Sequence, residues 1–348
     1  MPAHPLETDA LIIGAGPAGL FAAFELGLLG INAHMVDALP YVGGQCIELY
    51  PDKPIYDIPG TPATTGRQLV ASLLEQIKPF NTPMHLGQQV SVIEKQNDAR
   101  FKVTSTKQQS FICKTIVIAA GVGAFLPKKL SVSGLEAFEG TQIFYHLNQL
   151  PATQNQRITV VGSEDAAVQA AIDLSQNTHQ NYKVTLLHRR DVFNAPPDSL
   201  STLRDLVTSG KMKLSIGQIA GFDTEKAQLS ALQVTDVNGV TAPLPTDTVL
   251  VLQGLSPKLG PVADWGLALE RKQLNVDTEK FQTSENGIFA VGDINTYPGK
   301  KKLIVSGFHE ATLAAFAAAE IIFPNTPTQL QYTTTSTQLL KRLGRAIE

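Results

Sequence analysis

Apolar and polar positions follow the same order in two separate stretches of the chain. In residues 8–38, an apolar run precedes a glycine-rich segment, which is followed by apolar residues at helical spacing and then by a second apolar run. This order predicts a strand, a tight turn, a helix and a second strand. The same order returns in residues 157–190. Each stretch is therefore interpreted as one βαβ unit, and the pair suggests two nucleotide-binding domains.

Each unit is followed by a hairpin pattern that ends in a buried strand, at residues 101–121 and again at 229–254. A further strand at 286–294 and a helix at 310–322 would complete the first domain. We therefore predict an α/β fold with two Rossmann-like domains, the second inserted in the first. The predicted bounds are 1–120 and 291–330 for the first domain, 121–290 for the second, and 331–348 for a C-terminal extension that belongs to neither.

The first turn carries the glycine pattern of a dinucleotide site. Gly14 would make the tight turn, Gly16 would let a pyrophosphate approach the backbone, and Gly19, after Ala18, would let helix and strand pack closely. The N–H groups and dipole of the helix N-terminus favour the phosphate. Asp37, at the end of the next strand, could accept both hydroxyls of an adenosine ribose. The alternative for Asp37 is a solvated acid.

The second turn departs from this pattern. Gly162 is present, but Glu164 takes the middle glycine position and Ala167 the third. A side chain at Glu164 puts close approach of a pyrophosphate in doubt.

The strand that ends the second unit carries cations where the first carries an acid. His188, Arg189 and Arg190 follow each other there. Arginines bind a 2′-phosphate by charge-assisted hydrogen bonds, whereas an acid would repel it. The pair therefore favours NADP over NAD, and the alternative is two solvated loop arginines. Two nucleotide sites in one chain imply a flavin at the first and a pyridine nucleotide at the second.

Composition narrows the class of partner and compartment. The net charge of -3 gives no global field that would attract nucleic acid. Two cysteines argue against a disulfide framework and fit a reducing compartment. We expect no signal peptide, and the apolar run 311–323 is shorter than the ~20 residues of a membrane span. The expectation is a cytoplasmic protein without nucleic-acid, membrane or metal sites.

Three motifs, at residues 14–19, 118–121 and 291–293, resemble those of the two-dinucleotide-binding-domain flavoproteins. In that group the last aspartate, Asp293 here, holds the FAD ribityl chain or pyrophosphate. A disulfide reductase needs two neighbouring cysteines. No C-x-x-C occurs, and Pro51 stands where a C-x4-C partner of Cys46 would be. The sequence therefore excludes thioredoxin-reductase chemistry.

Residues 43–60 and 331–336 closely resemble the thioredoxin-reductase-like type of ferredoxin–NADP reductase. The resemblance implies a homodimer with non-covalent FAD. Hydride would pass between NADPH and the flavin, and single electrons would pass to ferredoxin or flavodoxin. Tyr332, from the partner's tail, would cover one flavin face, and Tyr50 would lie near the flavin. The other FAD contacts implied by the resemblance are those of Asp37, Gln45, Val90 (through its backbone), Phe125, Asp293 and Thr334.

Other readings stay open. Cys46 could serve an NADPH oxidase or peroxidase, or the chain could be a flavin redox sensor that turns over slowly. An acidic ferredoxin would need a cationic patch near the flavin. Lys300–Lys302 and the basic residues at 341–345 are the candidates, and either cluster could instead be solvated.

Overall fold

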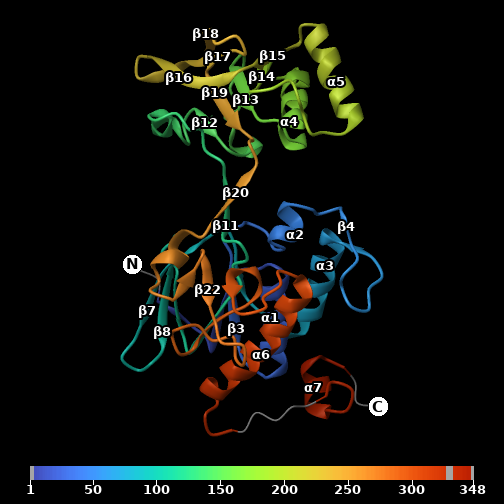
Figure 1. Ribbon diagram of the computed structural model, residues 1–348, viewed down its shortest axis with the longest axis vertical. Coiled ribbons are helices and arrows are strands. Elements are labelled where there is room, and N and C mark those ends of the chain that lie inside the picture. The colour runs from blue at the N-terminus through green and yellow to red at the C-terminus, as the bar shows by residue number, and fades with distance from the viewer. Residues whose placement is uncertain (1–3, 327–331, 346–348) are drawn as a thin grey trace. The chain divides into compact units, whose positions relative to one another are not determined.

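The computed structural model describes residues 4–326 and 332–345 (Figure 1). The chain divides into two compact units, here called unit 1 (up to Phe125 and from Pro257 onward) and unit 2 (Leu126–Ser256). Unit 2 is inserted in unit 1, but its bounds differ from the predicted 121–290. Residues 257–290 belong to unit 1 because Val262, Leu267 and Leu274 are buried in its core. The connecting strands β11 (Ala124–Pro127) and β20 (Leu255–Lys258) pair with each other.

Unit 1 contains most of the short strands and five of the α-helices of the described chain. Its strands are β1 (Leu6–Glu7), β2 (Ala10–Ile13), β3 (Ala33–Val36), β4 (Pro54–Ile55), β5 (Thr64–Thr65), β6 (Met84–His85), β7 (Val90–Lys95), β8 (Phe101–Ser105), β9 (Ser110–Cys113), β10 (Thr115–Ile118), β21 (Leu269–Glu270), β22 (Gln273–Asn275), β23 (Ile288–Ala290) and β24 (Asn295–Thr296). Its helices are α1 (Pro17–Leu28), α2 (Gln45–Glu48), α3 (Gly66–Ile77), α6 (Ile304–Ile322) and α7 (Thr337–Arg342), with 3-10 turns η1 (Lys78–Phe80), η4 (Gly260–Asp264) and η5 (Gly292–Ile294).

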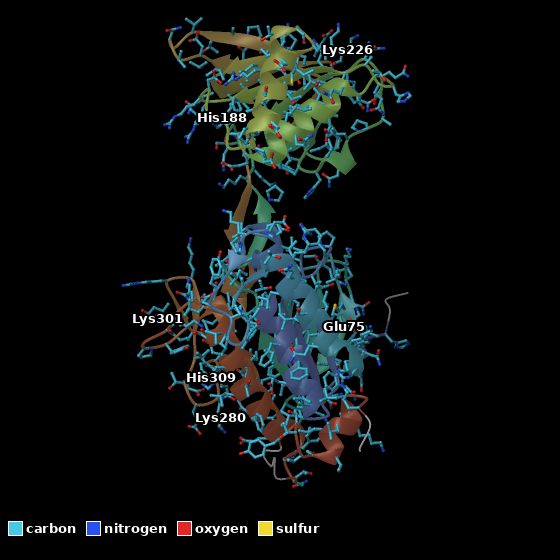
Figure 2. All side chains as sticks on the ribbon, turned by 90° about the vertical axis from the view of Figure 1, so that its right-hand side faces the viewer. Glu75, His188, Lys226, Lys280, Lys301 and His309 are labelled. Carbon is cyan, nitrogen blue, oxygen red and sulfur yellow. The ribbon has the colours of Figure 1, made fainter. Side chains whose placement is uncertain are left out.

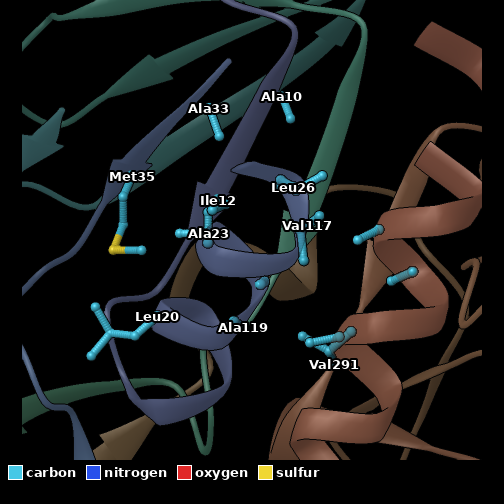
Figure 3. Packing of buried hydrophobic residues seen from close by; sticks show 14 of the residues in the cluster. Ala10, Ile12, Leu20, Ala23, Leu26, Ala33, Met35, Val117, Ala119 and Val291 are labelled. Carbon is cyan, nitrogen blue, oxygen red and sulfur yellow. The ribbon is translucent and has the colours of Figure 1, made fainter. Parts of the chain in front are cut away.

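A parallel sheet in the order β23-β10-β2-β3-β6 forms the centre of unit 1. All four residues of β2 are buried, which is typical of a strand covered on both faces. Ile12 packs with α1, α3 and α6, whereas its neighbours Leu11 and Ile13 pack with the sheet β1-β9-β8-β7. Figure 1 shows the helices and this second sheet on opposite sides of the unit, and Figure 3 shows the helix-side core.

The predicted return of the chain to the first sheet is confirmed. Strand β23 pairs in parallel with β10. The following helix, α6, begins at Ile304 rather than at 310. Its first turns pack closely on the neighbouring chain: a Cβ at Gly307 would lie 3.3 Å from the Cβ of Ala18 and 3.4 Å from Gly292 Cα. None of the helices within residues 4–326 and 332–345 has the length and apolar character needed to cross a bilayer.

Unit 2 is a second parallel sheet, in the order β12-β19-β13-β14-β15, with an antiparallel sheet β16-β17-β18. Its core lies on both faces of the parallel sheet. The α/β class with two Rossmann-like units agrees with the prediction. Its elements are β12 (Ile143–Phe144), β13 (Arg157–Val161), β14 (Lys183–His188), β15 (Met212–Ile216), β16 (Gln218–Glu225), β17 (Gln228–Thr235), β18 (Thr241–Pro245), β19 (Thr248–Val251), α4 (Asp165–Gln176), α5 (Pro197–Thr208), η2 (Leu135–Phe138) and η3 (Leu147–Gln149).

The C-terminal segment groups with unit 1. The prediction had assigned it to neither domain. Leu339 of α7 is buried, and the Arg342 guanidinium donates a hydrogen bond to the carbonyl oxygen of Leu28, at the C-terminal end of α1. The position is favourable for a cation because the last carbonyls of a helix lack partners within the helix and carry partial negative charge.

Candidate functional site

The turn between β2 and α1 has the backbone shape that its glycines predict. A Cβ at Gly14, where φ is +113°, would lie 2.3 Å from the carbonyl oxygen of Ala119. A Cβ at Gly19 would lie 1.9 Å from the carbonyl oxygen of Gly14. At Gly16, which is the N-cap residue of α1, there is more space: the atom nearest to an added Cβ would be Gly44 Cα, at 3.9 Å. The helix N-terminus is therefore open to a phosphate.

Asp37 connects this turn to the end of β3. Its carboxylate accepts hydrogen bonds from the backbone N–H groups of Ala15, at 2.5 Å, and Leu39, at 2.7 Å. Burial raises the pKa of Asp37, and the two N–H groups oppose that shift. Each carboxylate oxygen has a further lone pair. Asp37 can thus hold the turn and still accept a hydroxyl.

One pocket in unit 1 gathers most of the predicted flavin-site residues. It encloses about 1150 Å³ of space, including its open mouth. Gly19 supports the turn from behind and is not in the lining. Of the predicted residues, those lining the pocket are Gly14, Gly16, Ala18, Asp37, Gln45, Tyr50, Val90 and Asp293.

Asp293 and Gln45 meet in this pocket from distant parts of the chain. The Gln45 side-chain amide, in α2, donates to the Asp293 carboxylate at 3.0 Å. Asp293 lies in η5, directly after β23, and its backbone carbonyl accepts from Gln273 at 3.2 Å. A glycine cradle, an open helix N-terminus and an acid at each of two strand ends fit FAD.

Cys46 and Tyr50 lie next to each other in the lining. The Cys46 thiol lies 3.7 Å from the Tyr50 hydroxyl. Burial is the largest cause that raises the pKa of both groups. The other cysteine, Cys113, is also free and buried, and its pKa is raised to about 12. Both cysteines are therefore protonated at neutral pH, which is unfavourable for a peroxidase nucleophile.

The sequence reasoning missed the part of the lining that comes from the returning chain. Leu259, Val262 and Trp265 line the pocket. The indole N–H of Trp265 donates to the carbonyl of Ser91 at 3.3 Å, beside Val90. These residues were missed because the domain boundary was predicted at 290. The signal available was the only tryptophan of the chain.

The tail residues do not complete this pocket in their own chain. Tyr332 is 67% exposed and Thr334 is exposed, and neither is in the lining. For Phe125 the structure describes the backbone, in β11, but its side chain lies outside the described part.

The cationic cluster at 300–302 is not a single exposed patch. The Lys300 side chain is 7% exposed and is paired with Glu310. Lys301 and Lys302 are exposed, and Lys302 lines the pocket (Figure 2 labels Lys301). The expectation for Lys300 as a docking residue was therefore wrong, because its ammonium group is buried in unit 1.

In the glycine turn of unit 2, Gly162 packs closely against its neighbours, as the first glycine of such a turn does. A Cβ at Gly162 would lie 2.3 Å from the carbonyl oxygen of Leu252 and 2.7 Å from the Cβ of Ala167. The Glu164 carboxylate turns to Asn194 and accepts from its side-chain amide at 2.7 Å. With Glu164 at the N-cap and Asp165 in the first turn, α4 begins with two acids. This N-terminus is less favourable for a phosphate than that of α1.

The predicted cations lie where β14 ends. Arg189 and Arg190 are exposed, and no ion pair is recorded for either within the described residues (His188 is labelled in Figure 2). Burial, and then the charges of the two arginines, lower the pKa of His188. Arg204, which the sequence reasoning missed, pairs with Asp191 at 2.5 Å. Arg189 and Arg190 are therefore available to an anion.

Comparisons with known proteins agree with this arrangement. Residues 8–318 match the model of the pyridine nucleotide-disulphide oxidoreductase family. The chain is 56% identical to a protein named ferredoxin--NADP reductase from Albidiferax ferrireducens, over 98% of this chain and 96% of that one. It is 55% identical to a protein of the same name from Polaromonas sp., over 98% and 93%.

Solved structures with the same fold include two thioredoxin reductases. That of Gloeobacter violaceus has a TM-score of 0.57 at 23% identity, over 94% of this chain and 98% of that one. That of Lactococcus lactis has a TM-score of 0.55 at 24% identity, over 91% and 99%. Together with the sequence matches, the chain therefore belongs to the pyridine nucleotide-disulphide oxidoreductase family and, within it, to the ferredoxin–NADP reductase group that its motifs resemble.

Proposed function

We propose that this protein is a ferredoxin–NADP reductase that transfers hydride between NADPH and FAD and single electrons between FAD and ferredoxin or flavodoxin. The observation that carries the proposal is a dinucleotide pocket without a redox disulfide. Cys46 and Cys113 are the only cysteines of the chain, and they lie free in two different core clusters. Electrons therefore have no disulfide through which to leave, and must pass directly to an external carrier.

Residues of unit 1 would hold FAD. Gly14, Gly16 and the N-terminus of α1 would bind the pyrophosphate, Asp37 the adenosine ribose, and Asp293 the ribityl chain or pyrophosphate. When bound, FAD supplies the exchange between two-electron and one-electron transfer. No general base is needed, because the hydride moves without a separate proton step. The protein's part is to orient the reactants and to exclude water.

Unit 2 would bind NADP(H). Arg189 and Arg190 are the proposed ligands of the 2′-phosphate, with Gly162 in the turn and His188 beside the arginines. Lowering of its pKa keeps His188 neutral at pH 7, so the charge at this strand end comes from the arginines. The acids at the start of α4 make the turn a weaker pyrophosphate site than that of unit 1.

A homodimer in which the tail covers the partner's flavin belongs to the same proposal. In its own chain the tail is fixed at the C-terminal end of α1, while the pocket lies at the N-terminal end of this helix. Tyr332 and Thr334 would therefore act on a second subunit. Deletion from residue 331 onward should raise electron leakage to oxygen, and unchanged kinetics and oligomeric state would contradict this role.

A cytoplasmic location is also part of the proposal. The buried free cysteines fit a reducing compartment of this kind.

The deciding experiment is reduction of cytochrome c by the purified protein with NADPH, with and without ferredoxin or flavodoxin, and with NADH as control. Strong dependence on the carrier and preference for NADPH are expected. NADPH turnover that ignores the carrier would favour an oxidase or peroxidase. Slow anaerobic reduction of the flavin by NADPH would favour a redox sensor.

A further inference from the structure

A buried polar cluster lies behind the loop that carries Asp293. The Glu310 side chain, in α6, is fully buried and accepts four hydrogen bonds. The donors are the backbone N–H of Gly292 at 2.7 Å, the Asn295 amide at 2.9 Å, the Tyr297 hydroxyl at 2.9 Å and the Lys300 ammonium. Glu310 and Lys300 therefore form a buried ion pair in the interior of unit 1.

The pair holds both sides of one residue. Glu310 accepts from the N–H of Gly292, and Lys300 donates to the carbonyl oxygen of Gly292 at 2.9 Å. Gly292 has a φ of +78°, and a Cβ there would lie 3.2 Å from the Cβ of Ala18. Its backbone is thus fixed by two charged groups and by close packing. The next residue is Asp293, whose carboxylate lines the pocket.

Folding alone does not account for this cluster. Taking an ammonium and a carboxylate out of water costs about as much as their attraction returns, so apolar residues of the same size are often as stable. The Oδ1 atom of Asn295 is buried without a hydrogen-bond partner within the described residues, a further cost of polarity at this position. The polar groups instead converge on the single loop between β23 and β24.

We infer that Lys300 and Glu310 act together as a positioning unit that sets the backbone of Gly292, and through it the Asp293 carboxylate, for the bound flavin nucleotide. The inference rests on the proposed function only in taking this pocket as the FAD site. Neither residue is in the pocket lining, so both act through the loop rather than by touching the cofactor. Removing one charge leaves the other buried and unpaired, whereas removing both avoids this cost.

The chain offers a matched control on the same helix. Glu320, also in α6, pairs with Lys280 at 2.9 Å, but these side chains are 59% and 41% exposed (Figure 2 labels Lys280). An exposed ion pair contributes little to stability. Lys280 and Glu320 also lie outside the loop between β23 and β24. Lys280→Met and Glu320→Gln therefore make the same chemical changes without touching Gly292.

The test measures FAD binding to the apoproteins of Lys300→Met, Glu310→Gln and the double variant. Binding is monitored through the quenching of flavin fluorescence. Each single variant should bind FAD at least about tenfold more weakly than the unchanged protein. The double variant should bind FAD more tightly than either single variant. Both control variants should bind as the unchanged protein does.

Thermal midpoints of the apo and FAD-bound forms separate positioning from folding. At a fixed FAD concentration, the midpoint rises with the logarithm of the affinity of the folded protein for FAD. A positioning role predicts a smaller rise in the single variants and a larger one again in the double variant. The inference is overturned if apo midpoints fall while the rise with FAD is unchanged, or if the two changes are simply additive. Should the single variants fail to fold, a double variant that folds and binds FAD as tightly as the unchanged protein also overturns it.

This outcome is distinguishable from failure of the proposed function. A protein that binds FAD normally but shows no carrier-dependent reduction leaves the positioning unit intact and removes the reductase. If reduction depends on the carrier but FAD affinity does not change in the Lys300 and Glu310 variants, the reductase stands and the positioning unit is removed.

Discussion

The Asp37 carboxylate accepts the backbone N–H of Ala15 at 2.5 Å, so the acid at the end of one strand fixes the glycine turn at the end of its neighbour. The turn and the ribose site are in this way one structure. The acid accepts a second N–H, from Leu39, at 2.7 Å. A change at Asp37 therefore affects two parts of the nucleotide site.

Asp37→Ala should weaken FAD binding by about tenfold or more, because two N–H groups lose their acceptor and the ribose loses a ligand. Asp37→Asn keeps one side-chain oxygen and should lose less. Titration of the apoproteins with FAD measures both. If Asp37→Ala bound FAD as tightly as the unchanged protein, Asp37 would be no more than a structural acid.

Cys46→Ser should retain at least half of the carrier-dependent activity. Burial raises the pKa of the Cys46 thiol above its ordinary value of 9.0, so little thiolate exists at pH 7. For the same reason alkylation of the native protein by iodoacetamide should stay slow up to about pH 9. Abolished NADPH oxidation in Cys46→Ser, or rapid alkylation at pH 7, would favour the peroxidase alternative.

Charge reversal separates the lysines of the 300–302 segment. Lys301→Glu and Lys302→Glu should raise the KM for ferredoxin several-fold at low salt, with less effect at high salt, because exposed charges steer an acidic partner. Reduction of a neutral dye should not change in Lys301→Glu. Equal ferredoxin kinetics for Lys301→Glu and the unchanged protein at low salt would place the docking surface elsewhere. Lys300 is unsuitable for this test because its side chain is buried.

Local patterns in the sequence predicted the βαβ units and their turns well. The run ALII of β2 reads as a buried strand, and the spacing of Gly14, Gly16 and Gly19 reports the backbone geometry directly. The features of the site that the sequence did not predict depend on contacts between residues far apart in the chain. The ion pair of Lys300 with Glu310 and the place of Trp265 in the lining arise from packing of the returning chain, which composition and spacing do not encode.

The tail shows a different limit. The sequence indicated a separate extension at 331–348, but the contact of this extension with the end of α1 depends on the Leu28 carbonyl, which no side-chain pattern reveals. Likewise Glu164 was recognised as a departure from the glycine motif, whereas its hydrogen bond to Asn194 comes from a loop 30 residues away.

The nucleotide preference depends on Arg189 and Arg190, which follow β14 and are exposed. Replacing both by alanine should raise the KM for NADPH by about tenfold or more, since a hydrogen bond to a charged group contributes about 1.5–3 kcal/mol. The KM for NADH, which lacks the 2′-phosphate, should change little. Lys183→Met is the matched control, because Lys183 is an exposed cation at the opposite end of the same strand. Since His188 is neutral at pH 7, the KM for NADPH should also be nearly constant between about pH 7 and 8. Equal losses for NADPH and NADH in the arginine variant would show that these residues serve the fold of unit 2 and not the choice of nucleotide.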